Sequence, residues 1–170
     1  TIGFNRIPTL KSLRIWNFSG ANRDVTDLSE STQLDTLYLA QSNIRSLNGL
    51  SRMNRLEYLH LYRCRSLEDI SSLSSVKDTL KSLQIELCPQ ITDFSVLREL
   101  CQLERLHLSG SNRLPDLAFL RDLENLRTFT FDVFIESGDL TPCLDLSYVY
   151  CGKNRKHYNL RDKDLPKIEF

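Results

Sequence analysis

Two consecutive rows of sequence, LKSLQIELCPQITDFSVLRELCQ (80–102) and LERLHLSGSNRLPDLAFLRDLEN (103–125), align position by position. Their apolar side chains return after 23 residues, and a third row opens at Leu126. The aligned pairs are Leu80 with Leu103, Leu83 with Leu106, Ile85 with Leu108, Cys88 with Ser111, Ile91 with Leu114, Phe94 with Leu117, Leu97 with Leu120 and Leu100 with Leu123. A period of this length predicts a repeat architecture, in which similar units stack on one another.

The same template extends in both directions from these two rows. Earlier rows begin at Leu56, Leu34 and, more loosely, Leu10, and a sixth row begins at Leu126. In each row the last two leucines of L-x-x-L-x-L are two residues apart, so they share one face of a strand. The second half, as in ITDFSVLREL (91–100), is spaced by threes, which suits 3₁₀ turns. Stacked rows would place parallel strands about 4.8 Å apart.

Each row reads L-x-x-L-x-L-x-x-(N/C), and this pattern resembles that of leucine-rich repeat proteins. The resemblance covers about residues 10–134, with a degenerate continuation to about 151, and is strongest to the short-repeat type of internalins and phosphatase regulators. It implies an α/β fold: a curved leucine-rich repeat solenoid with a parallel β-sheet on the concave face and 3₁₀ or short helical turns on the convex face. It also implies recognition of another protein, in an adaptor, toxin-neutralising or immune-type sensor role.

We expect residues 1–151 to form the repeat domain, with about six repeats and a degenerate terminal strand, and residues 152–170 to form a C-terminal cap or tail. The open end of a solenoid exposes leucines, so a non-repeating cap is expected there. Alternating apolar side chains predict that the terminal strand contains Leu144, Leu146, Tyr148 and Tyr150. At the other end, a short cap is expected to begin with Ile2, Phe4 and Ile7.

The ninth place of each row, where many repeats carry asparagine, holds Phe18, Ser42, Cys64, Cys88, Ser111 and Phe134. We interpret this column as structural, because cysteine and serine are small and form hydrogen bonds with neighbouring loops. Adjacent strands would place Cys64 and Cys88 within reach of a disulfide. The five cysteines, an odd number without C-x-x-C spacing, instead favour reduced thiols and a cytoplasmic location.

The charges and apolar segments exclude several classes of partner. Twenty-two basic and 22 acidic side chains cancel, which argues against a general binder of nucleic-acid phosphates. No apolar run is long enough for a transmembrane helix, and the first residues lack the apolar segment of a signal peptide. The basic run at 153–156 is expected to be a solvated surface of the cap. We therefore expect no nucleic-acid partner, no membrane association and a monomer in isolation.

The outward strand positions, which are the third, fifth and seventh places of each row, are the expected binding surface. The only tryptophan and three of the six tyrosines fall on them. Tryptophan, tyrosine and arginine dominate interface hot spots, although aromatic residues also favour sheet faces for reasons of strand propensity alone. We expect a protein-binding patch that consists of Trp16, Tyr38, Tyr58, His60, Tyr62, Arg63, Arg105 and His107.

Catalysis is not expected from this sequence. His60 and His107 share a column two rows apart, so about 10 Å separates their strands, which is too far for direct ligands of one metal. A cysteine–histidine pair needs an exposed thiol, whereas Cys64 and Cys88 are expected to point into the turn core. No glycine-rich phosphate loop, G-x-S-x-G or H-E-x-x-H motif is present. We therefore expect no catalytic residues, no metal and no cofactor.

Two functions fit these features. The first is a non-catalytic module that binds a partner protein through its concave face. The alternative is a structural repeat domain of a larger protein, whose concave face packs intramolecularly.

Overall fold

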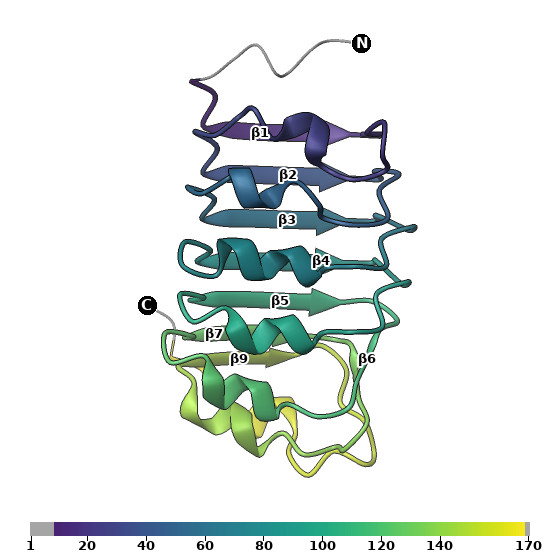
Figure 1. The fold of residues 1–170 in the computed structure, drawn as a ribbon. Helices are drawn as coiled ribbons and strands as arrows, with labels where there is room; N and C mark the ends of the chain where they lie inside the picture. Colours follow the sequence, from purple (N-terminus) through teal and green to yellow (C-terminus); the bar gives the residue numbers. More distant parts are fainter. Residues whose placement is uncertain (1–8, 169–170) are drawn as a thin grey trace.

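The computed structural model describes residues 9–168, which form one long parallel sheet and a series of 3₁₀ helices (Figure 1). Each strand of this sheet comes from the same part of a row, and the order β1-β2-β3-β4-β5-β7-β9 makes consecutive rows neighbours. The strands are β1 (Ser12–Trp16), β2 (Thr36–Ala40), β3 (Tyr58–Tyr62), β4 (Ser82–Glu86), β5 (Arg105–Ser109), β7 (Thr128–Phe131) and β9 (Tyr148–Cys151). A separate short pair is β6 (Arg113–Leu114) with β8 (Phe134–Ile135). The predicted stack of parallel rows is confirmed.

The second half of each row contains a 3₁₀ helix, and these helices lie on one side of the sheet, in front of it in Figure 1. Side chains three residues apart eclipse one another in this conformation, so Phe94, Leu97 and Leu100 all reach the core. None of the helices within residues 9–168 has the length and apolar character needed to cross a lipid bilayer. The helices are η2 (Thr26–Leu28), η3 (Leu50–Arg52), η4 (Ser71–Val76), η5 (Ser95–Glu99), η6 (Ala118–Asp122), η7 (Thr141–Asp145) and η8 (Asp162–Asp164).

Inward-facing side chains of successive strands form one continuous core between the sheet and the helices. The register pairs Leu37 with Leu59 and Leu39 with Leu61, and the next rows continue both columns. These four leucines are almost completely buried. Burial of a leucine side chain contributes about 1.5–3 kcal/mol, and here it is achieved only by contact between rows. A single row could not bury its own leucines, so the stability of each row depends on its neighbours.

A residue in the left-handed backbone conformation follows each of the first five strands. These residues are Asn17, Gln41, Arg63, Leu87 and Gly110, with φ values of 56°, 52°, 53°, 54° and 127°. The N–H groups of Arg63 and Leu87 donate to the last strand residue of the next row, at N–O distances of 2.8 and 2.9 Å. This conformation costs an L residue roughly 1–2 kcal/mol, which the hydrogen bonds help to offset. After the second, third and fourth strands, the residue that follows this turn is buried; these residues are Ser42, Cys64 and Cys88.

The cysteines that follow these turns are structural. Cys64 and Cys88 are buried, and their thiols point to the carbonyl oxygens of Leu39 and Leu61 in the preceding row, at 3.6 and 3.8 Å. The hydrogen-bonded Cys64 thiol, together with burial, raises the pKa of Cys88 far above its ordinary value. Both thiols are free rather than joined in a disulfide.

The same column was assigned wrongly in the last two rows. Ser111 is exposed, whereas Asn112 is buried and its side-chain amide donates to the carbonyls of Cys88 and Ile91, at 3.0 and 2.8 Å. In the final row Val133, rather than Phe134, takes the buried place. Compared with the earlier rows, the turn before Asn112 is one residue longer and the turn before Val133 is one residue shorter, so counting from the strand selects the neighbouring position in both rows.

The terminal strand is shorter than predicted. Leu144 lies in η7 and is 45% exposed, and Leu146 ends that helix, so neither belongs to β9. Pro142 near the start of η7 favours a helical turn, because its φ is fixed and the missing N–H is not needed there. The alternation of leucines was therefore coincidental.

Residues 152–168 return against the last rows, in yellow in Figure 1. The Tyr158 hydroxyl accepts a hydrogen bond from the Ile135 N–H at 3.0 Å and donates to the Val133 carbonyl at 3.3 Å. Tyr158 and Leu165 are both buried. This segment therefore covers the end of the core. The N-terminal cap expected from Ile2, Phe4 and Ile7 lies outside the described residues.

Candidate binding site

Aromatic side chains of neighbouring strands form a continuous row on the side of the sheet opposite the 3₁₀ helices, which we call the open sheet face. Trp16 on β1 contacts Tyr38 on β2 edge-on, with ring centroids 5.3 Å apart. Tyr38 contacts His60 on β3 at 4.6 Å, and His60 is followed by Tyr62 at 6.4 Å. Edge-to-face contacts between rings are favourable, so the row is ordered without a partner.

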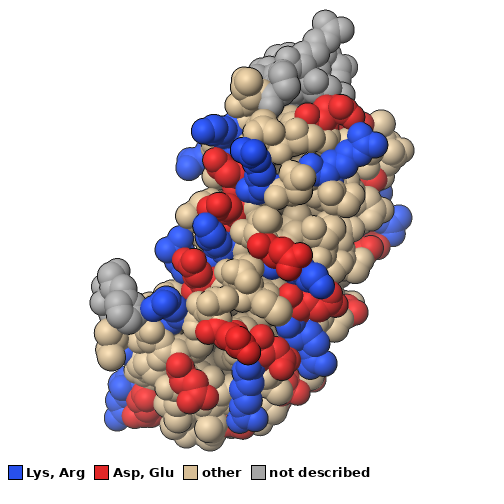
Figure 2. Space-filling view, turned by 60° about the vertical axis from the view of Figure 1, so that its left-hand side comes forward, with Lys and Arg blue, Asp and Glu red and all other residues tan. Residues whose placement is uncertain are grey.

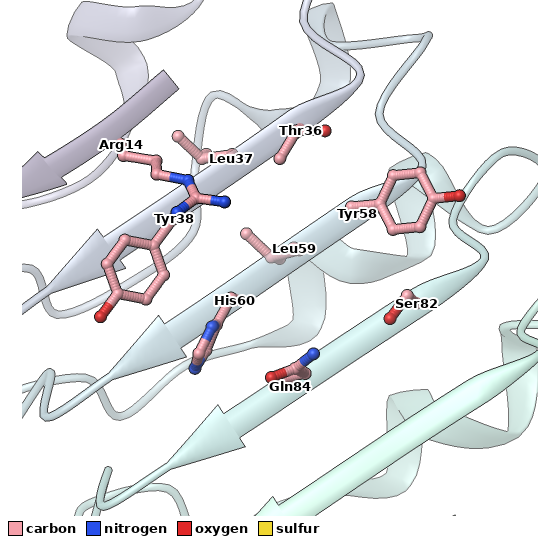
Figure 3. Close-up of a pocket in the computed structure, with 9 residues that line it drawn as sticks. All are labelled: Arg14, Thr36, Leu37, Tyr38, Tyr58, Leu59, His60, Ser82 and Gln84. Carbon is pink, nitrogen blue, oxygen red and sulfur yellow. The ribbon is translucent and has the colours of Figure 1, made fainter. Parts of the chain in front are cut away.

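This row borders a hollow of about 550 Å³ (Figure 3). Tyr38 and Tyr58 stand at opposite ends of it, and Arg14, His60 and Gln84 provide polar groups between them (Figure 3). These side chains come from β1 to β4, since strand alternation turns the third and fifth places of each row to this face. Aromatic walls with a few polar groups are typical of sites that bind organic side chains or ligands.

A chain of polar contacts crosses the sheet beside the hollow. His60 Nε2 lies 2.7 Å from Glu86 Oε1, and the other carboxylate oxygen lies 4.0 Å from His107 Nε2. His107 Nδ1 lies 2.6 Å from the hydroxyl of Thr130. Burial lowers the pKa of His60 below its ordinary value of 6.5, although Glu86 opposes the shift. At pH 7 the imidazole is therefore neutral, and its Nε2–H donates a hydrogen bond to Glu86.

Two arginines stack on tyrosines of the open sheet face. The Arg63 guanidinium lies 5.2 Å from the centre of the Tyr62 ring, and that of Arg105 lies 5.9 Å from the centre of the Tyr58 ring. Such cation–π contacts at exposed sites contribute about 0.5–1 kcal/mol. They restrict the rotamers of both tyrosines and so lower the entropy lost when a partner binds.

The structure places seven of the eight predicted site residues on the open sheet face and Arg63 in the turn just beyond β3. Trp16 is 56% exposed and Tyr58 38%, so these rings are open to a partner. Not every outward position is accessible, however, because Ala40 and Ser82 are buried. Their side chains are short, and larger neighbours cover them.

Sequence reasoning missed three residues of this surface. Glu86 lies between the two histidines in the predicted register, but it was left out of the predicted site because it occupies a different column. Tyr148 and Tyr150 on β9 extend the same face, and Lys167 Nζ lies 5.6 and 5.7 Å from the centres of their rings. Their alternation was visible in the sequence, but they lie beyond the repeat template.

The polar chain through Glu86 does not resemble a metal centre. Within the described residues, no three His, Cys, Asp or Glu side chains are grouped so that they could hold a metal ion. The Thr130 hydroxyl is hydrogen-bonded to His107, so Glu86, His107 and Thr130 form one chain of polar contacts on the open sheet face. These contacts fix the orientation of the side chains.

Comparison with solved structures identifies the fold. The crystal structure of internalin C2 from Listeria monocytogenes matches with a TM-score of 0.70 and 22% sequence identity, over 85% of this chain and 62% of that chain. The chain has the leucine-rich repeat fold. Internalin F of the same organism matches with a TM-score of 0.47, 18% identity and coverage of 91% and 58%. A leucine-rich repeat protein of Leptospira interrogans matches with a TM-score of 0.48, 16% identity and coverage of 92% and 43%.

This chain thus spans less than two thirds of the length of each of these neighbours. No protein-family model matches its sequence, and no curated protein shows significant sequence similarity to it. Leucine-rich repeat domains typically act as recognition modules that bind other proteins on an extended surface. Because one fold can serve several functions, the function of this chain depends on the side chains that its surface presents.

Proposed function

We propose that this protein binds another protein through its open sheet face and does not catalyse a reaction. The observation that supports this function is the unbroken row of Trp16, Tyr38, His60 and Tyr62 beside a hollow of about 550 Å³. Tryptophan and tyrosine bury a large area at a low cost in side-chain entropy, and they are enriched among interface hot spots.

The backbone beneath this row is rigid. Strands β2 and β3 are hydrogen-bonded on both sides, and the turn that follows each of them is bonded to the next row. A preorganised surface loses little conformational entropy on binding, so more of the contact energy appears as affinity. This rigidity suits recognition of one partner shape rather than adaptation to many.

The charge balance of the whole chain favours a protein over nucleic acid as the partner. The 22 basic and 22 acidic side chains cancel, and acidic and basic groups are interspersed on the side of the molecule shown in Figure 2. Pairs between rows, such as Lys81 with Glu57 at 3.0 Å, account for part of this mixing. Phosphate backbones are bound by continuous basic surfaces, and that side of the molecule lacks one.

Site-specific photocrosslinking in native cell extract would identify the partner. Benzoylphenylalanine replaces Tyr62 in one variant and Leu144 in the other; Leu144 is an exposed apolar residue in η7, on the opposite side of the sheet. We expect mass spectrometry to find one protein crosslinked through position 62 and not through position 144. Equal capture at both positions would mean that the open sheet face has no special role.

Affinity measurements with that purified protein then test the residues. We expect Tyr38→Ala and Tyr62→Ala each to weaken binding about tenfold or more, since hot-spot aromatic residues contribute at least about 1.4 kcal/mol. Leu144→Ala serves as the matched control and should keep wild-type affinity. Wild-type affinity in both tyrosine variants would remove the open sheet face from consideration.

The same experiment separates the alternative function, a structural domain whose open sheet face packs on another part of a longer chain. In that case crosslinks from position 62 would stay within one polypeptide, and the isolated domain would aggregate instead of sedimenting as the monomer that we propose. The cytoplasmic location expected from the cysteines is likewise part of the proposal, and cell fractionation tests it directly.

A further inference from the structure

A second hollow, of about 580 Å³, lies at the edge of the sheet where the strands end, on the right-hand side of Figure 1. Two of its walls come from parts of the chain that are far apart in sequence. Arg63 and Arg65 follow β3, whereas Lys153 and Arg155 follow β9. We call this hollow the basic groove.

The groove concentrates positive charge in a chain whose formal net charge is zero. Four cations line it, and Asp132 is the one carboxylate among its lining residues in the described chain. Asp132 is already engaged, because one oxygen accepts the Gly110 N–H at 2.7 Å and the other lies 3.6 Å from Lys153 Nζ. The groove therefore has an uncompensated positive charge that the fold does not use.

Two arginines of this groove have hydrogen-bond donors without partners among the described residues. Arg155 lies over the Phe134 ring at 4.7 Å from its centre, and its buried Nε has no hydrogen-bond partner among the described residues. Arg65 is exposed and forms no hydrogen bond or ion pair within residues 9–168. A buried donor without a partner is unfavourable, so an anionic group that reached it would be favoured.

Apolar side chains form the other part of the groove. Leu87 is 41% exposed, and the left-handed turn that it occupies (φ 54°) directs it outward between the basic residues. Pro89, two residues later, is also exposed. Carboxylates beside one apolar side chain would match both the charge and this apolar surface.

We propose that the basic groove binds an acidic segment of a partner protein, with glutamate or aspartate on its cations and an apolar residue on Leu87 and Pro89. A protein segment fits better than nucleic acid for two reasons. Among residues 9–168, no aromatic side chain lines the groove for base stacking, and its cations occupy one hollow instead of a track along the surface. The groove is a second surface, distinct from the open sheet face.

A fluorescence titration with defined peptides tests this proposal. The probe is a labelled ten-residue peptide of alternating glutamate and leucine, and the reference peptide has glutamine in place of glutamate. We compare wild type with the double variant Arg65→Gln/Lys153→Gln, which spares Arg63 because it also borders the open sheet face. The matched control is Lys77→Gln/Arg121→Gln, which removes two exposed charges near η4 and within η6.

We expect the acidic peptide to bind wild type and the control alike, and to bind Arg65→Gln/Lys153→Gln at least about tenfold more weakly. The glutamine peptide should bind measurably to none of the three proteins. Raising the salt concentration should lower the affinity of the acidic peptide for wild type. Equal thermal melting of the two double variants shows that the loss is not unfolding. Equal affinity in both double variants, or no binding of the acidic peptide to wild type, would overturn the proposal.

Two further arms distinguish this inference from other readings. Tyr38→Ala should bind the acidic peptide like wild type, because the groove does not depend on the open sheet face. Failure of the acidic peptide to bind the groove would leave the proposed function of the open sheet face intact. Failure of the open sheet face to bind a partner would likewise leave the groove proposal intact. An oligothymidylate that binds tighter than the acidic peptide, and loses affinity in Arg65→Gln/Lys153→Gln, would replace the peptide proposal with a nucleic-acid site.

Discussion

His60 on β3 and Glu86 on β4 are joined by a hydrogen bond of 2.7 Å that runs diagonally across two strands. The register pairs His60 with Gln84 and Tyr62 with Glu86, so the glutamate reaches back by two positions. Diagonal neighbours of this kind are within reach of long side chains. The contact places a charged group beneath the aromatic row and fixes the orientation of the imidazole.

The protonation of His60 should make folding stability depend on pH. Burial lowers its pKa in the folded state below the ordinary 6.5, so between these two values the unfolded chain binds the proton more tightly. Stability is therefore fully present above about pH 6.5 and declines as the pH falls below it. We expect wild type to lose more stability between pH 7.5 and pH 5.5 than His60→Gln in urea unfolding. The same pH dependence in both proteins would show that His60 titrates normally.

The side chain of Asn112 should stabilise the fold by linking its own turn to the turn of the preceding row. Asn112→Ala removes the donors to two buried carbonyls, and we expect a loss of about 2–3 kcal/mol in unfolding free energy. The neighbouring Ser111→Ala is the control and should stay within about 0.5 kcal/mol of wild type, because Ser111 is exposed. Urea denaturation of both variants measures these changes in unfolding free energy. A larger loss for Ser111→Ala than for Asn112→Ala would contradict the structure.

Tyr158 should stabilise the C-terminal cap through its hydroxyl. Tyr158→Phe leaves the Ile135 N–H and the Val133 carbonyl without this partner, so we expect a loss of about 1–2 kcal/mol in unfolding free energy. Tyr150→Phe makes the same chemical change at an exposed ring and should be nearly neutral. Thermal or urea unfolding measures both, and equal effects would mean that the buried hydroxyl contributes nothing.

A substitution at Leu87 should increase the stability of the folded protein. Leu87→Asn keeps a side chain but tolerates φ of 54° far better, and we expect a gain of about 0.5–1 kcal/mol in stability. Leu87→Val should have the opposite sign, because a β-branched side chain is strained in the left-handed region. Calorimetric melting temperatures distinguish the pair. A stabilising valine would indicate that burial rather than backbone strain governs this position.

The thiols should differ sharply in reactivity in the native protein. Cys101 is exposed, whereas the other four cysteines are buried. Burial also raises the pKa of Cys143 to about 12, which further lowers its thiolate population. We expect one thiol to react rapidly with an aromatic disulfide reagent and this fast phase to vanish in Cys101→Ser. Rapid reaction of a second thiol in the native state would contradict the burial of the other four cysteines.

The repeat architecture was predictable because its information is local. The spacing of leucines within each row defines which side chains face inward, and the predicted columns, such as Leu37 above Leu59 and Leu83, appear in register. The outward columns followed from the same alternation, which explains why Trp16, Tyr38, His60 and Tyr62 could be grouped in advance. Counting failed at Asn112, where the turn is one residue longer, and at Val133, where it is one residue shorter, since a change of length within a turn has no periodic signal.

The sequence by itself thus determined the stack of parallel rows and the face on which its aromatic side chains lie. The reason is that the same leucine spacing recurs in every row and defines the inward and outward positions each time. Only the tertiary structure decided that Glu86 bridges two histidines, that Tyr158 closes the end of the core, and that Lys153 and Arg155 meet Arg63 and Arg65 in one groove. These contacts join residues that occur once each and lie far apart in the chain. Their proximity follows from how the last rows and the cap pack, and no spacing in the sequence encodes it.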